Sequence, residues 1–371
     1  MRIAVDGFEL RKRFTGVGRF LANLLDALLE RDRDNHYTLF LKESSPRVPT
    51  RSNLESRVLE GADTHTRWQN GALHRALKRG GFDLFLSPDH SVPLLYWGRS
   101  FMTIHDVSWK TQPADYSLKE RTVRDLKTRI GVRRAQWVFT DSVFSRDEIL
   151  RHYPGAADKI TVVPLAVEAD FKPASEEDLA AFRTRYGLGK TPLIGFLGSM
   201  FRRRRIRELL EAFAQIAAQT DATLLLVGRD FHEGALDDAL CGRRVRWLER
   251  IQEDEINAFY SSLDLFVYPS DHEGFGFPPL EALACGTIPV VSATSSLREI
   301  FQGLAVFMDS HRPGQMAAVL LDSLKRRNDI SRRLLATFGH RRKYFSWNRV
   351  AGDYLRRYPP GSDRTGRHRH E

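Results

Sequence analysis

The chain has 371 residues, a length typical of about two domains, and 42% of them are hydrophobic, as in globular proteins with substantial cores. The net charge of +10 favours anionic partners, such as phosphates, nucleic acids or anionic lipids, over purely neutral ones. The only two cysteines, Cys241 and Cys285, exclude a disulfide framework, and neither has metal-ligand spacing around it. We therefore expect a reducing, cytoplasmic location.

Short apolar runs alternate with amphipathic stretches, starting from MRIAVDGFEL, which reads as a buried strand and lacks the features of a signal peptide. No apolar run approaches the roughly 20 residues that span a bilayer. In the first half, strands are predicted at 2–6, 37–41, 82–87, 101–105 and 137–140, and helices at 20–30 and 119–134. In the second half, strands are predicted at 193–198, 223–228, 245–248, 265–269 and 288–292, and helices at 207–219 and 254–262.

This alternation predicts an α/β protein with parallel sheets, and two such series imply two doubly wound domains. The polar, proline-containing segment 168–177 suits a linker, so the predicted domains are 1–167 and 168–344. A final helix is expected at 345–358. The polar, Arg/His-rich tail 359–371 is expected to be disordered.

The segment 273–286, EGFGFPPLEALACG, combines two glutamates with glycines and prolines. It follows the predicted strand at 265–269, and Pro278 and Pro279 suit the first positions of a helix, where a missing amide hydrogen matters least. The segment is therefore a loop and helix start at the carboxyl end of a parallel strand. Open α/β sheets bind their ligands at that end.

Gly274 and Gly276 let the backbone approach a ligand, and the amides there, with the positive helix end, make an anion site that a diphosphate would fit. Glu273 and Glu281 flank this site, and carboxylates suit hydroxyl groups. A nucleotide-sugar has the matching layout of sugar, diphosphate and ribose. For either glutamate alone, a solvated side chain is the better interpretation. A glycosidase acid pair is disfavoured, because such carboxylates flank a scissile bond from opposite sides.

The stretch EGFGFPPLEALACGTIPVVSATSSLREI resembles the E-x7-E signature of retaining GT-B glycosyltransferases of family 4 (glycosyl transferases group 1). The resemblance covers nearly the whole chain. It implies two Rossmann-like domains facing a cleft, the first binding the acceptor and the second the nucleotide-sugar donor. It also implies that Glu273 contacts the transferred sugar and Glu281 the ribose diol. The implied donor-binding loop comprises Gly274, Phe275, Gly276 and Phe277.

Arg203 and Arg204 fall where the family has an Arg-Lys pair that grips the donor diphosphate, so arginine replaces lysine here. Guanidinium groups pair well with phosphate, and cations stabilise a departing diphosphate. A solvated basic turn and a nucleic-acid patch are the alternatives. Which of the four arginines at 202–205 acts is left open.

Further candidates lie in the first half of the chain. His105 and Asp106 end a predicted strand, and the resemblance places the histidine near the donor sugar and leaving phosphate, with Asp106 orienting it. A structural His-Asp dipeptide is the alternative. Gly16 and Gly18 precede the helix at 19–30 and would allow close approach to the donor phosphate or the acceptor, with a tight turn as the alternative.

Two basic, partly amphipathic stretches, 73–79 and 119–134, are predicted to dock on anionic lipid beside a lipid-linked acceptor, at the inner face of the cytoplasmic membrane. Ordinary solvated helix faces are the alternative. Neither stretch contributes a residue to the predicted donor site.

The resemblance implies a retaining glycosyltransferase that moves a hexose, mannose by preference and from GDP-mannose, to a saccharide or lipid-linked saccharide in lipopolysaccharide or other surface polysaccharide synthesis. We expect no metal and no other cofactor, because no DxD-like acidic pair presents itself. A sugar-nucleotide epimerase on the same fold is one alternative. A basic nucleic-acid-binding protein is another; it explains the charge but leaves Glu273 and Glu281 without a role.

Overall fold

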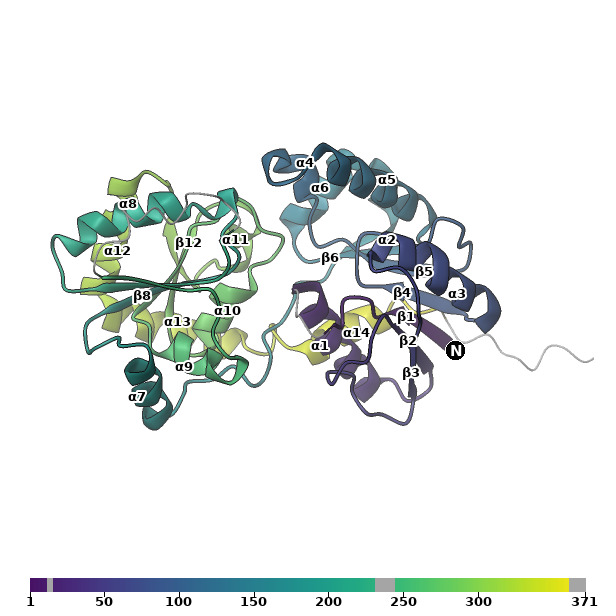
Figure 1. Cartoon of the computed structure of the whole chain (residues 1–371), viewed down its shortest axis with the longest axis horizontal. Helices are drawn as coiled ribbons and strands as arrows, with labels where there is room; N and C mark the ends of the chain where they lie inside the picture. Colours follow the sequence, from purple (N-terminus) through teal and green to yellow (C-terminus); the bar gives the residue numbers. More distant parts are fainter. Residues whose placement is uncertain (12–15, 231–243, 360–371) are drawn as a thin grey trace, which may run out of the picture.

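The computed structural model describes residues 1–11, 16–230 and 244–359. Two α/β domains lie side by side, each built on one parallel sheet flanked by helices (Figure 1). The first sheet has the order β3-β2-β1-β4-β5-β6-β7, and the second has the order β10-β9-β8-β11-β12-β13. This arrangement confirms the predicted fold of two doubly wound domains.

The elements of the first domain are β1 (Arg2–Asp6), α1 (Gly16–Arg31), β2 (His36–Leu41), β3 (Leu54–Val58), α2 (His65–Trp68), α3 (His74–Gly80), β4 (Leu84–Ser87), β5 (Ser100–Thr103), α4 (Ser108–Thr111), α5 (Leu118–Arg134), β6 (Trp137–Thr140), α6 (Val143–His152) and β7 (Ile160–Val162). The second domain and the final helix comprise α7 (Glu176–Arg185), β8 (Leu193–Leu197), α8 (Ile206–Ala217), β9 (Thr223–Val227), β10 (Val245–Leu248), α9 (Ile256–Ser261), β11 (Leu265–Tyr268), α10 (Phe277–Ala284), β12 (Ile288–Ser292), α11 (Ser295–Ile300), β13 (Val306–Met308), α12 (Pro313–Lys325), α13 (Arg327–Arg341) and α14 (Trp347–Leu355).

Every strand predicted from the sequence is present, with ends shifted by at most two residues. The sequence analysis does not predict β3, β7 and β13, and all three lie at sheet edges. An edge strand is paired on one side only, so it needs fewer apolar residues to be stable. The predicted boundary after residue 167 falls in the connection between β7 and α7. The predicted disordered tail lies outside the described residues, apart from Pro359.

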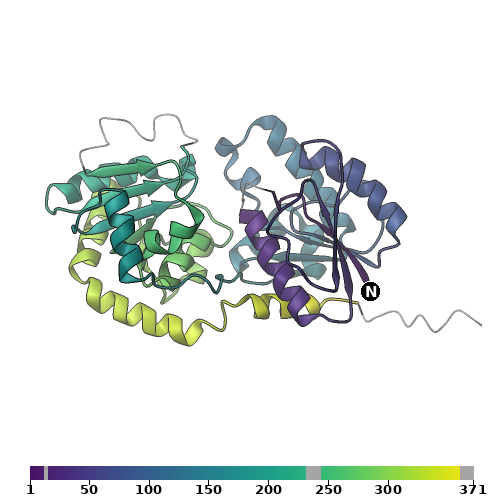
Figure 2. The same ribbon diagram turned by 60° about the horizontal axis from the view of Figure 1, so that its bottom comes forward.

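The last helix, α14, returns to the first domain and packs against α1 (Figures 1 and 2). The ring of Tyr354 stacks on Phe139, with centroids 3.8 Å apart, and its hydroxyl is 2.9 Å from Oγ1 of Thr103. The chain therefore passes between the domains twice, once before α7 and once after α13. Two connections of this kind form a natural hinge between the domains.

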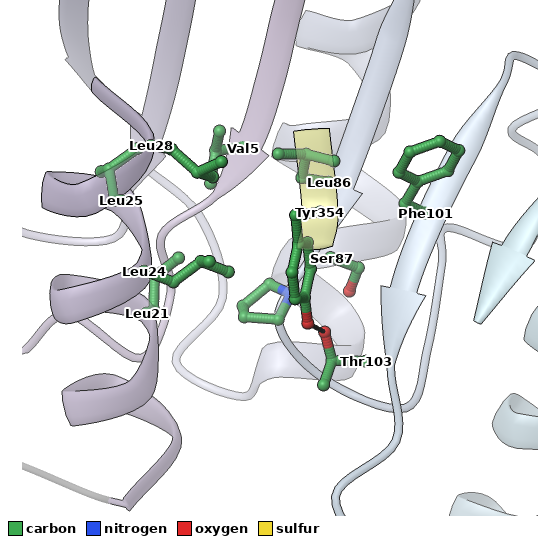
Figure 3. A pocket seen from close by; sticks show the side chains of 11 residues that line it. Val5, Leu21, Leu24, Leu25, Leu28, Leu86, Ser87, Phe101, Thr103 and Tyr354 are labelled. Atoms are coloured by element: carbon green, nitrogen blue, oxygen red, sulfur yellow. Dashed lines mark hydrogen bonds between the residues drawn. The ribbon is translucent and has the colours of Figure 1, made fainter. Parts of the chain in front are cut away.

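A small cavity of about 20 Å³ lies under α1 and α14 (Figure 3). Leu21, Leu24, Leu25 and Leu28 of α1 line one side, at the helical spacing of a buried stripe. Tyr354 lines the other side. The volume is that of about one water molecule, far too small for a sugar. The leucine stripe fixes α1 on the sheet, so that the beginning of this helix faces the second domain.

Candidate functional site

Three segments meet where the domains face each other: the loop between β11 and α10 (residues 269–276), the turn after β8, and the chain just after β5. Each follows the carboxyl end of a strand, as predicted. The hydroxyl of Ser142 donates to the carbonyl oxygen of Gly274 at 2.9 Å, and that of Ser145 approaches the same oxygen at 3.3 Å. The loop of the second domain is thus held directly against the first.

The sequence predicts that Gly274 is glycine so that a ligand can approach the backbone, but the structure gives another explanation. A Cβ atom there would lie 2.4 Å from the carbonyl oxygen of His105, across the domain boundary. The close approach is between two protein backbones, so contact with a ligand is not needed to explain the residue. Gly276 has φ 102°, and a Cβ there would lie 2.7 Å from Leu297, so only glycine suits the turn into α10.

Glu273 lies within this loop and is largely buried. Its Oε1 accepts a hydrogen bond from the hydroxyl of Ser270 at 2.6 Å and also pairs with Arg204. The guanidinium of Arg204 in turn lies over the ring of Tyr268, 4.7 Å from its centroid. The predicted sugar-binding carboxylate and the predicted phosphate-binding cation are therefore direct neighbours.

The four consecutive arginines at 202–205 differ in their exposure and in their partners. Arg202 is exposed, whereas Arg203 crosses to the first domain and pairs with Asp115 at 2.6 Å. Arg204 pairs with Glu273, and Arg205 turns away to Asp271 at 2.5 Å. Only Arg203 and Arg204 of the four thus point to the surface between the domains, and these are the two that the resemblance selects.

Glu281 lies on the first turns of α10 and is 1% exposed. Its Oε1 is 2.7 Å from Arg19 of the first domain, and its Oε2 accepts a hydrogen bond from the hydroxyl of Tyr260 at 2.6 Å. Arg19 also contacts Glu168 at 2.6 Å. Arg19 directly follows Gly18 in the sequence, but its ion pair across the domain boundary is not predicted.

Gly16 and Gly18 are the first and third residues of α1, next to Arg19. A Cβ at Gly16 would meet no described atom within 4 Å, so the described protein does not itself require glycine there. The predicted close approach of a donor or acceptor at Gly16 stays a prediction. Phe275 is 3% exposed, so only its backbone is available to a ligand, and the ring of Phe277 packs beside Arg19 at 5.7 Å.

His105 is oriented by Asp141, and not by Asp106 as predicted. Its Nδ1 lies 2.7 Å from the Asp141 carboxylate, and its Nε2 lies 3.2 Å from the carbonyl oxygen of Pro88. Asp106 points the other way and accepts a hydrogen bond from the amide of Ser108 at 2.8 Å. Adjacent residues at a strand end project to opposite sides, which is why the sequence neighbour is not the partner.

The charge state of His105 follows from these contacts. Burial alone lowers the pKa of an imidazole, but the Asp141 carboxylate, helped by Asp89 and Asp106, outweighs burial and raises the pKa of His105 to about 9. A protonated ring donates from both nitrogens, which fits acceptors at both Asp141 and Pro88. His105 is therefore a cation at neutral pH.

A second histidine, His272, joins the domains beside this site. Its Nε2 lies 2.7 Å from Glu148 and 3.1 Å from the hydroxyl of Thr111, both in the first domain. Burial lowers the pKa of His272, but Glu148 and Asp106 outweigh it, so the net shift is upward. The sequence analysis does not single out His272, although it directly precedes Glu273.

Glu299 makes a further contact between the domains. Its two carboxylate oxygens accept hydrogen bonds from the amides of Val143 and Phe144, at 2.9 and 3.0 Å, at the start of α6. A carboxylate at the positive end of a helix is stabilising. Together with the serine contacts to Gly274, this arrangement holds the site in a closed form.

Polar side chains also gather in the first domain near the carboxyl ends of β1 and of β4, the strand that lies between β1 and β5. The carboxylate of Asp6 is 2.9 Å from Nε2 of His65, and Asp89 contacts both His65, at 3.6 Å, and His90. Lys127 is only 8% exposed and is attracted by the charges of Asp6 and Asp89. Asp89 lies close enough to influence His105. This group, Asp6, His65, Asp89, His90 and Lys127, is called the first-domain polar group below.

Within the described residues, no three His, Cys, Asp or Glu side chains are grouped as ligands for a metal ion would be. The expectation that the reaction needs no metal or other cofactor stays a prediction. Cys285 is a buried free thiol, and Cys241 lies outside the described residues.

Comparison with known proteins decides the family. The family described as Glycosyltransferase Family 4 matches residues 14–171, and Glycosyl transferases group 1 matches residues 180–336. The chain is 32% identical over 274 residues to O-antigen chain mannosyltransferase B of Escherichia coli, which covers 70% of each protein. The chain belongs to the family 4, group 1 glycosyltransferases. It is therefore an enzyme, and this family membership sets aside the epimerase and nucleic-acid alternatives.

Solved structures agree with the GT-B fold of this family. WaaG, a glycosyltransferase involved in lipopolysaccharide biosynthesis, superposes with a TM-score of 0.76 at 15% identity, covering 96% of this chain and 100% of that one. Anabaena Alr3699/HepE, solved in complex with UDP and glucose, superposes with a TM-score of 0.75 at 16% identity, covering 96% and 98%. At these identities the likeness concerns the fold.

Proposed function

We propose that this glycosyltransferase is a retaining mannosyltransferase that uses a nucleotide-diphosphate mannose, GDP-mannose by preference, and a saccharide or lipid-linked saccharide acceptor. The observation that carries the donor site is the Arg204–Glu273 pair, with Arg203 beside it and His105 opposite. Mannose is supported by the O-antigen mannosyltransferase relative. Alr3699/HepE was solved with UDP and glucose, so the base and the sugar need a direct test.

The paired charges of the site suggest how a donor binds. Arg204 neutralises Glu273, and Arg203 neutralises Asp115. A diphosphate would attract both guanidinium groups, which bind phosphate through two parallel hydrogen bonds. The carboxylate of Glu273 would then be released to accept hydrogen bonds from the sugar hydroxyls. On donor binding, the two guanidinium groups would exchange their carboxylate partners for the diphosphate, so these cations are never left unpaired.

Glu281 takes the ribose in the same scheme. Its carboxylate is fixed by Arg19 and Tyr260, and its burial excludes competing water. A carboxylate is suited to accept two hydrogen bonds from a vicinal diol. Glu273 lies in the loop before α10 and Glu281 lies within the helix, so the helix start that lies between them in the chain is the proposed place of the diphosphate.

The proposed reaction breaks the bond between sugar C1 and the diphosphate oxygen and forms a bond from C1 to the acceptor oxygen on the same face. The acceptor's hydroxyl proton moves to the departing phosphate oxygen, so the products are the glycoside and the nucleoside diphosphate. Arg203, Arg204 and the protonated His105 surround the region where negative charge develops. Fixed cations in a closed site stabilise such charge strongly.

The first-domain polar group is the proposed acceptor side. It includes residues at the carboxyl ends of β1 and of β4, the strand next to β5, and its Asp89 is close enough to His105 to raise the pKa of that imidazole. Carboxylates, imidazoles and an ammonium together bind hydroxyl groups both as donors and as acceptors. Among the described residues, no helix has the length and apolarity needed to cross a bilayer. A lipid-linked acceptor would therefore be met from the membrane surface.

The test is product analysis by NMR after incubation with GDP-mannose, labelled with ¹³C at C1, and a mannose-terminated acceptor. The proposal predicts an α-linked product with the configuration of the donor. Glu273→Gln should form product at least about 100-fold more slowly, since a charged contact to the transition state is lost. A β-linked product would contradict retention. Turnover of a different nucleotide-sugar, with none of GDP-mannose, would contradict the donor assignment.

A further inference from the structure

An unusual part of the first-domain surface surrounds α5. Of the ten large hydrophobic side chains exposed among the described residues, five lie on α5 or on the nearby loop before β5. They are Leu95, Trp97, Leu118, Val123 and Leu126, and Trp97 is 79% exposed. The other five are spread over different elements. Clustered exposed apolar side chains on a protein surface indicate an interaction site.

The outer face of α5 is also strongly basic. The helix contains seven basic and two acidic residues, a net +5 out of the chain's +10. At about 100° per residue, nine residues share an arc of roughly 160°. These are Leu118, Lys119, Thr122, Val123, Leu126, Arg129, Ile130, Arg133 and Arg134, and none is acidic.

The two acidic residues of α5 are already engaged. Glu120 forms the capping box with Ser117, and Asp125 pairs with Lys110 at 2.7 Å. Asp125 also reaches Arg129 at 3.4 Å, at the border of the arc. Among the described residues, Lys119 and Arg133 have no ion-pair partner. The arc is thus a mixed apolar and cationic surface that contains no acidic residue itself and has one acid, Asp125, at its border.

Trp97 lies beside the carboxyl-terminal end of α5 and extends this surface. The guanidinium of Arg134 lies 4.2 Å from the ring centroid of Trp97, and Trp97, Ile130, Arg133 and Arg134 line one hollow. An exposed indole beside cations is the arrangement that suits the headgroup region of a bilayer. The stretch at 73–79 offers no such face, because Leu73 and Leu77 are buried in the core.

The position of α5 connects this surface to the cleft. Asp115, three residues before the helix, pairs with Arg203 of the donor domain. From there the helix runs for about 25 Å along the outside of the first domain (Figure 1). A flat surface touching α5 would therefore lie beside the mouth of the cleft, on the proposed acceptor side.

We infer that the face formed by α5 and Trp97 docks this enzyme on an anionic phospholipid bilayer, with Trp97 and Leu126 in the headgroup region and Arg133 and Arg134 against lipid phosphates. The inference rests on the proposed function, since docking would bring a lipid-linked acceptor to the cleft. It commits to a membrane because the surface combines apolar and cationic groups without acids, which fits anionic headgroups above acyl chains.

The experiment is co-sedimentation of the full chain with vesicles of phosphatidylcholine alone or with 30 mol % phosphatidylglycerol, without donor or acceptor. We expect recovery with the anionic vesicles only, and less in 0.5 M salt. Arg133→Ala/Arg134→Ala should lower the partition coefficient about 10- to 30-fold, and Trp97→Ala/Leu126→Ala at least about fivefold. Matched controls lie on the other domain: Trp247→Ala, at a 47% exposed tryptophan, and Arg332→Ala/Arg333→Ala on α13.

Equal recovery with both vesicle types, or equal losses in the control variants, would overturn the inference. If the wild type does not bind vesicles but is a dimer, and Trp97→Ala is a monomer, the inference is overturned. The surface would then contact a second copy of the chain. A thermal-shift response to GDP is measured on every variant and should be unchanged. If the wild type binds vesicles but shows no thermal shift with GDP, the proposed function is contradicted and the docking face remains. If the wild type shows the thermal shift but does not bind vesicles, only the docking face is contradicted.

Discussion

Replacing His105 with glutamine should change the pH dependence of folding stability. His105 has a folded-state pKa of about 9, against about 6.5 for an unfolded histidine. The folded state therefore binds the proton more tightly, and the resulting stability is fully present below pH 6.5 and lost as the pH rises through 9. A folded-state pKa that is higher by about 2.5 corresponds to at most about 3.4 kcal/mol of stability.

The assay is urea denaturation of the wild type and of His105→Gln at several values between pH 6 and pH 9.5. The difference in unfolding free energy should shrink by about 2–3 kcal/mol over this range, on top of any constant difference. His340→Gln, at an exposed histidine of α13, serves as the control and should show little pH dependence. A wild-type minus His105→Gln difference that stays flat across the range would refute the Asp141–His105 pair as a charged pair.

Three further changes test the site itself. Glu273→Gln should keep the thermal midpoint within a few degrees, because glutamine can still accept the Ser270 hydrogen bond, while turnover falls about 100-fold or more; near-normal turnover would contradict its role. Glu281→Gln should weaken nucleotide-diphosphate binding by about tenfold in calorimetry, as expected for one charged hydrogen bond, and unchanged affinity would contradict ribose contact. Ser142→Ala should lower the unfolding free energy by about 1–2 kcal/mol, because the change removes both the hydrogen bond to Gly274 and the side-chain cap for the amide of Ser145 at the start of α6; an unchanged value would mean that neither bond contributes.

The sequence was a good guide wherever local pattern decides structure. The strands β1, β6, β10 and β12 match their predicted ends because each is an apolar run bounded by turn or helix residues. The strand β3 was missed because its sequence, LESRV, is mostly exposed at the sheet edge. Its stability comes from pairing with β2, which no local pattern reports.

In the candidate site, too, local sequence indicates some features, and contacts between distant residues determine the others. The sequence motifs select Glu273, Glu281, Arg203 and Arg204, and the structure places them in the segments that follow β8 and β11, while their roles in donor binding stay predictions. The partners of these residues were not found. Asp141 lies 36 positions from His105, and such contacts depend on how neighbouring strands align and how the two domains close.

The same limit applies to the residues that hold the cleft shut. Glu299 lies far in sequence from Ser142 and Ser145. The only signals available were the residue types: short hydroxyl residues at a helix start, and a carboxylate on another helix. Such residues are common in any protein. Only the arrangement of the two domains gives them a shared role.

The central claim is that a nucleotide diphosphate binds between Arg204 and Glu281. The most direct measurement is a thermal-shift panel with GDP, UDP, ADP and dTDP, alongside a short DNA duplex, on the wild type and Glu281→Ala. The account predicts that one nucleoside diphosphate, GDP by preference, raises the melting temperature of the wild type and has little effect on the variant. Stabilisation by DNA alone, or an equal response in Glu281→Ala, would contradict it.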